Sequence, residues 1–88
     1  MSKLYFESEN NIRDNGAKYL AEGIKDSKSL ASLKLTRNKI GDDGAKYLAE
    51  GIKDSKSLSK LDLQYNDLSE ASKTLLKNAK SENLEIIF

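Results

Sequence analysis

The chain contains a long internal repeat. Fifteen consecutive residues, from Gly16 to Leu30, recur without a change from Gly44 to Leu58, which sets a period of twenty-eight residues. Periods of about twenty to fifty residues are typical of stacked supersecondary units, because one unit cannot bury its own apolar face. The repeat therefore predicts a stacked architecture, which offers a binding surface more readily than an active site.

Each copy carries the pattern of one amphipathic helix. Short polar residues come before the apolar pattern, at Asp14 and Asn15 in the first copy and at Asp42 and Asp43 in the second, and we expect them to cap the helices. Gly23 and Gly51 lower helix propensity, and they are expected to permit close packing or a frayed last turn. Apolar residues spaced three and four apart form the buried face of each helix: Ala17, Leu20, Ala21 and Ile24, and then Ala45, Leu48, Ala49 and Ile52.

A strand is predicted before each later helix. Leu33 and Leu35 alternate with polar residues, and so do Leu61 and Leu63, which is the period of a half-buried strand. Because a helix separates each strand from the next, we expect parallel pairing in one sheet with all helices on one side. The other face of the sheet is then open to solvent.

The segment from Leu30 to Ser57, LASLKLTRNKIGDDGAKYLAEGIKDSKS, resembles the leucine-rich repeat of the ribonuclease-inhibitor-like subfamily. That family pattern, LxxLxLxxNxI followed by a helix, is filled twice: by Leu30, Leu33, Leu35, Asn38 and Ile40, and by Leu58, Leu61, Leu63, Asn66 and Leu68. The resemblance implies that the asparagines tie adjacent turns together through the backbone. It also implies a concave recognition surface between the strand leucines.

The resemblance predicts an α/β leucine-rich-repeat solenoid shaped as a short horseshoe, with a parallel sheet on the concave face and helices on the convex face. We expect one domain over residues 1–88. Its strand–helix units are placed at about 2–29, 30–57 and 58–83, and a terminal strand is placed at 84–88.

The first strand departs from the pattern by one residue. Asn10 matches the family asparagine, but Leu4 is six residues before Asn10, whereas Leu33 is five residues before Asn38. Either the strand bulges, with Leu4 and Phe6 in the leucine positions, or Tyr5 and Glu7 occupy that register.

Candidate contact residues come from the part of the repeat that has diverged. Ten of the thirteen positions from Ala31 to Asp43 differ from those between Ser59 and Ala71, and the unchanged three are inward positions of the motif. Selection for recognition, deliberate variation of an engineered scaffold, or chance would each produce this pattern. The predicted outward neighbours are Lys34 beside Asp62, Thr36 beside Gln64 and Arg37 beside Tyr65, with Tyr5 on the first strand.

Arg37 and Tyr65 also have a purely structural interpretation. The guanidinium and the ring could stack on each other at an exposed site, for about 0.5–1 kcal/mol, without contacting a partner.

The chain ends in an apolar segment, LEIIF. A terminal edge strand is a template for pairing with another chain, so Ile86, Ile87 and Phe88 are candidates for homodimer formation through end strands. Two alternatives stay open: the chain is part of a longer array, or Ile87 and Phe88 fold over the last apolar layer as a cap.

Composition argues against catalysis. The chain has no histidine and no cysteine, which removes the usual general base and the thiol nucleophile, and no phosphate-binding loop or metal-ligand spacing is present. We therefore expect no catalytic residues, no cofactor and no metal. Fifteen basic residues against fourteen acidic ones do not favour nucleic acid, and no apolar run favours a membrane. We expect a cytoplasmic protein-binding module.

Overall fold

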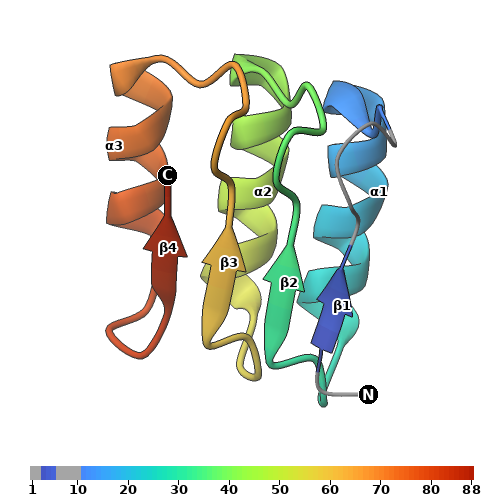
Figure 1. Ribbon diagram of the computed structural model, residues 1–88. Coiled ribbons are helices and arrows are strands. Elements are labelled where there is room, and N and C mark those ends of the chain that lie inside the picture. Colours follow the sequence, from blue (N-terminus) through green and yellow to red (C-terminus); the bar gives the residue numbers. More distant parts are fainter. Residues whose placement is uncertain (1–2, 6–10) are drawn as a thin grey trace.

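Strands and helices alternate along the chain in the computed structural model, which describes residues 3–5 and 11–88. The helices lie side by side on one face of the sheet, as predicted (Figure 1). In chain order the elements are β1 (Lys3–Tyr5), α1 (Arg13–Asp26), β2 (Ser32–Lys34), α2 (Asp42–Asp54), β3 (Lys60–Asp62), α3 (Glu70–Ala79) and β4 (Glu85–Ile87).

The four strands pair in parallel, in the order in which they occur in the sequence. Leu4, Leu33, Leu61 and Ile86 lie in one register across the sheet. Parallel pairing follows from the helical crossovers, since strands joined by a helix run in one direction.

This register shows which residue of the first strand occupies the leucine position. Leu4 pairs with Leu33, so the alternative with Tyr5 in the leucine position is wrong. Phe6, Glu7 and Asn10, on which the other part of that prediction depends, lie outside the described residues.

The core lies between the sheet and the helices. Leucines from β2, β3 and the turns after them meet the apolar faces of α1 and α2, which confirms the predicted helix pattern. Burial of one such side chain stabilises the fold by about 1.5–3 kcal/mol relative to leaving it exposed. The large fully buried members are Ile24, Leu33, Leu35, Ile40, Leu48, Ile52, Leu61, Leu63, Leu76 and Leu84.

One side-chain amide connects the turns that follow β2 and β3. The Oδ1 atom of Asn66 accepts hydrogen bonds from the backbone N–H groups of Asn38, at 2.9 Å, and Ile40, at 3.0 Å. Its Nδ2 atom donates to the carbonyl oxygens of Leu35, at 2.9 Å, and Leu63, at 3.0 Å. Asn66 thereby satisfies backbone groups of the preceding turn that are costly to leave unpaired.

The acidic residues at the helix N-termini act between helices, not on their own helix. Neither α1 nor α2 has a side-chain cap, so the prediction that Asp14 and Asp42 cap their own helices is wrong. Instead, an oxygen of Asp14 accepts a hydrogen bond from the N–H of Gly41, the residue before α2, at 2.6 Å. The carboxylate of Asp42 accepts from the N–H of Ser69, the residue before α3, at 2.9 Å.

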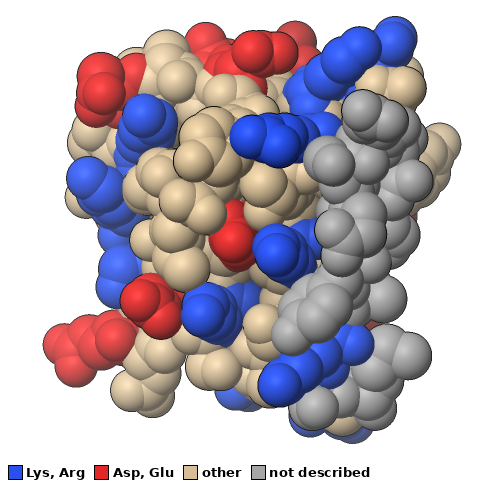
Figure 2. Space-filling model, viewed as in Figure 1, with Lys and Arg blue, Asp and Glu red and all other residues tan. Residues whose placement is uncertain are grey.

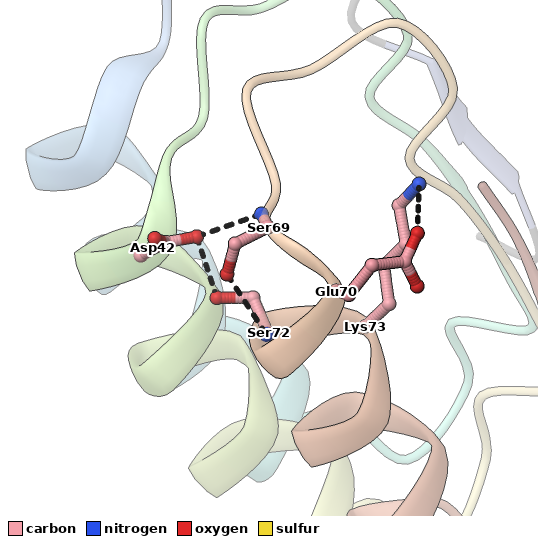
Figure 3. A network of polar contacts seen from close by, with 5 residues as sticks. All are labelled: Asp42, Ser69, Glu70, Ser72 and Lys73. Atoms are coloured by element: carbon pink, nitrogen blue, oxygen red, sulfur yellow. Dashed lines mark hydrogen bonds and ion pairs between the residues drawn. The ribbon is translucent and has the colours of Figure 1, made fainter.

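Asp42 has a second donor. The hydroxyl of Ser72 donates to the same carboxylate oxygen at 2.7 Å, while Ser69 caps α3 by accepting from the N–H of Ser72 (Figure 3). The bond from the Ser72 hydroxyl, and then the bond from the Ser69 N–H, lower the pKa of Asp42 below its ordinary value.

This pKa shift predicts an acid-sensitive part of the stability. A carboxylate whose pKa is lower in the folded chain favours folding fully above its unfolded pKa of about 3.9, and this contribution is lost as pH falls through the folded pKa. Asp42→Asn should therefore be less stable than the parent chain at neutral pH, and the difference should shrink in acid. Urea unfolding midpoints of both chains at neutral pH and below about pH 3 measure it. A difference that does not change with pH would contradict the assignment.

The two glycines of the repeated helices have different surroundings despite identical local sequence. A Cβ atom added to Gly51 would lie 2.7 Å from the carbonyl oxygen of Ala21, so glycine is what lets α2 approach α1. A Cβ atom added to Gly23 meets no described atom within 4 Å. The expectation of close packing is thus confirmed for Gly51 and wrong for Gly23.

This contrast gives a matched pair of substitutions. Gly23→Ala should raise the free energy of unfolding by about 0.5–1 kcal/mol, because alanine favours the helix and has room. Gly51→Ala has the same helix propensity but overlaps Ala21, and such overpacking costs about 1–3 kcal/mol. Urea unfolding should therefore shift to higher midpoints for the first variant and to lower midpoints for the second. Equal shifts for both would show that the α1–α2 contact is not close-packed.

Candidate functional site

The open face of the sheet carries two rows of side chains. Because side chains alternate along a strand, the residues on either side of the buried Leu33 and Leu61 point away from the helices. One row contains Lys34 and Asp62 in direct register, as predicted, and is continued by Tyr5 and Ile87. The side chain of Tyr5 lies outside the described residues.

The second row was not predicted from the sequence as part of the surface. It contains Lys3, Ser32, Lys60 and Glu85, which pair across the four strands. These residues lie two positions before the first row, so the alternation that identified Lys34 and Asp62 could have identified them too. Ser32 and Lys60 also differ between the two repeats, so divergence is a second signal for this row.

A shallow hollow joins β2 and β3 on this face. It is lined by Ser32, Leu33, Lys34, Lys60 and Asp62. The carboxylate of Asp62 accepts a hydrogen bond from the N–H of Gln64 at 3.0 Å, which fixes its position. No described residue forms an ion pair with Lys34 or Lys60. Their charges are available to a bound group.

Four predicted contact residues lie in turns, not in strands. The strands end at Lys34 and Asp62, and the following segments 36–39 and 64–67, here called the turn edge, reverse the chain. The predicted neighbours still meet, because backbone pairing continues: the N–H of Arg37 donates to the carbonyl oxygen of Gln64 at 3.1 Å.

Thr36 is less accessible than its predicted role requires. Its hydroxyl oxygen is buried and has no hydrogen-bond partner among the described residues. Gln64, its neighbour on the next turn, is half-buried.

Arg37 and Tyr65 stack at the turn edge. The Cζ atom of Arg37 lies 4.7 Å from the centroid of the Tyr65 ring, and 68% of Tyr65 is exposed to solvent. Both residues have a positive φ, 57° and 61°, so each adopts the left-handed region. Sequence reasoning predicted the contact but not this backbone conformation, which has no signature in an arginine or a tyrosine.

A second hollow opens beside this stack. It is lined by Asn11, Arg37, Lys39, Tyr65 and Asp67. Lys39 also has a positive φ, 59°, and so does Asn11, 52°. The hollow is therefore built mainly from residues that the turns hold in the left-handed conformation.

Charge of both signs is interleaved over this face of the molecule (Figure 2). In the part of the chain that the structure describes, the open face and the turn edge together carry five basic and three acidic side chains: Lys3, Lys34, Arg37, Lys39 and Lys60, and Asp62, Asp67 and Glu85. The two ion pairs among the described residues involve none of these; they link Lys25 with Asp54 and Lys73 with Glu70.

The apolar end of the chain packs mainly inward. Ile86 and Phe88 are half-buried against the core. The Nζ atoms of Lys73 and Lys77, on α3, lie 6.0 and 5.7 Å from the centroid of the Phe88 ring. Ile87 is half-buried on the open face, in register with Asp62.

The described residues contain no group of three or more metal-ligating side chains. In the same part of the chain, no helix has both the length and the apolar character needed to cross a bilayer. What the described surface offers is contact area with charged groups and exposed tyrosine rings, of which Tyr65 lies against Arg37 and Tyr47 lies against Lys18.

Comparison with known families agrees with the fold. Residues 8–21 and 26–49 match a family described as leucine-rich repeat. No curated protein matches the sequence. Repeats of this type commonly mediate protein–protein interaction, and the family is generally non-catalytic. Together with the parallel sheet and its helices, the match supports a leucine-rich repeat protein.

Proposed function

We propose that the chain is a non-catalytic protein-interaction module that binds a folded protein partner through the open face of the sheet. The observation that carries the proposal is where the repeats differ. The fifteen identical residues from Gly16 to Leu30 form most of α1 and the turn after it, whereas Lys34 faces Asp62 and Arg37 stacks on Tyr65. The ten differing positions between residues 31–43 and 59–71 also include the buried Ile40 and the start of α2, but the outward positions are the ones that could distinguish partners.

The finer classification is part of this proposal. The doubled pattern of leucines and asparagine supports the ribonuclease-inhibitor-like subfamily with twenty-eight-residue units, in which the open face is concave. The bonds of Asn66 to the preceding turn support the same assignment. Inhibition of a ribonuclease is not part of the proposal, because contact residues determine the partner and fold alone does not.

Matched charge reversals test the proposed surface. The double variant Lys34→Glu with Lys60→Glu changes the open face, and Lys28→Glu with Lys53→Glu makes the same charge change at exposed positions on or next to the helices. We expect the first variant to lose the proteins that the parent chain captures and the second to retain them, because rim and surface charges act on association at their own site. Unfolding midpoints of both should stay close to that of the parent.

If the open-face variant still captured the partner, the assignment of the open face as the binding surface would be wrong.

The same samples test the alternative function, a self-associating unit joined through its end strands. That alternative is favoured by β1 and β4 being the two edges of the sheet. Light scattering at two concentrations should give the mass of a monomer, because Phe88 packs against the core. A mass that rises with concentration would favour the alternative.

A further inference from the structure

The proposed function leaves open what kind of group the surface recognises, and the stack of Arg37 and Tyr65 bears on this. We infer that this stack, with Lys39, is a recognition site for side-chain carboxylates on an acidic segment of the partner protein. The inference rests on the proposed function and names the class of partner.

The first step of the argument is that turn stability does not explain these two residues. They occupy equivalent positions, and both have a positive φ, 57° and 61°. Asparagine and glycine adopt this conformation with little strain, whereas other residues adopt it at a cost. A chain shaped by stability alone would carry asparagine or glycine here. Strained residues of this kind are characteristic of binding sites, where the side chain matters more than the turn.

The second step concerns the free hydrogen-bonding groups. The Cζ atom of Arg37 lies over the Tyr65 ring, 4.7 Å from its centroid, and a guanidinium held over a ring can still donate its N–H groups to an acceptor. Arg37 and Lys39 form no ion pair with a described residue. A planar carboxylate fits a guanidinium with two parallel hydrogen bonds, which Lys39 would reinforce by its charge.

The third step is the charge of the surroundings. Among the described residues of the open face and turn edge, basic side chains outnumber acidic ones by five to three. Of the three acids, Asp62 already accepts a backbone hydrogen bond. An acidic segment crossing β2 and β3 would therefore meet Lys34 and Lys60 before reaching the stack. Charge complementarity favours such a partner.

The test measures binding and stability in the same variants. The probe is a fluorescein-labelled peptide that alternates glutamate and serine and has an amidated C-terminus, so that side chains supply the only carboxylates. Fluorescence anisotropy should show binding to the parent chain, and Arg37→Asn and Tyr65→Asn should each weaken it by at least about fivefold, as expected of contacts at the centre of an interface. Lys53→Asn, which removes a basic charge on α2, should leave the affinity unchanged.

Stability distinguishes recognition from a structural stack. Because asparagine suits the left-handed region, the urea midpoints of Arg37→Asn and Tyr65→Asn should equal or exceed that of the parent. Lower midpoints for both would show that the stack serves the fold and would overturn the inference.

Three binding results would also overturn it: no binding of the glutamate peptide, equal binding of a glutamine version, or tighter binding of a single-stranded oligonucleotide. The proposed function can survive these results. If capture of the partner is lost on reversal at Lys34 and Lys60 but kept in the Arg37 and Tyr65 variants, the open face binds a partner and only the carboxylate site is wrong.

Discussion

The geometry of the turns after β2 and β3 depends on the hydrogen bonds made by the side-chain amide of Asn66. Its oxygen and nitrogen reach four backbone groups on two successive turns, including the N–H groups of Asn38 and Ile40. A strand of three residues supplies few ladder bonds, so without these contacts the turns would leave polar groups unpaired next to the core. The turn edge inherits its conformation from this bond network, and the positions of Arg37 and Tyr65 follow.

Equivalent residues of the two repeats make different contacts. Gly51 permits a close contact with Ala21, whereas Gly23 meets nothing comparable among the described atoms. Among the described residues, Asp14 accepts a hydrogen bond from the N–H of Gly41 alone, whereas Asp42 accepts one from the N–H of Ser69 and one from the hydroxyl of Ser72. Each unit is completed by its neighbour, so the surroundings of a repeated residue depend on what stacks against it.

The fold was largely predictable from sequence because two periodicities and one repeat act together. Leucine alternation located β2 and β3, the apolar spacing located α1 and α2, and the period implied parallel strands. Helix capping was misassigned because the sequence shows which residues can accept a hydrogen bond but not which N–H group is nearest. Asp42 meets the N–H of Ser69, twenty-seven residues away.

The candidate surface was predictable only in part. Lys34 beside Asp62 and Arg37 beside Tyr65 follow from register, and both pairs are neighbours. The left-handed backbone at Arg37 could not be predicted, because it is imposed by bonds from another turn and not by the residue itself. The row containing Lys60 was not predicted, although Lys60 differs from its repeat equivalent Ser32 and lies two residues before Asp62 on the same strand.

The central claim is that the hydrogen bonds of Asn66 make the turns unfold together with the core. Native-state hydrogen exchange of the Asn38 and Ile40 amides tests this claim most directly. If the claim is right, both amides exchange only through global unfolding, with the same free energy as the amides of Leu35 and Leu63. Exchange of the two turn amides at much lower free energy, while Leu35 and Leu63 stay protected, would show that the turns open independently and would contradict the account.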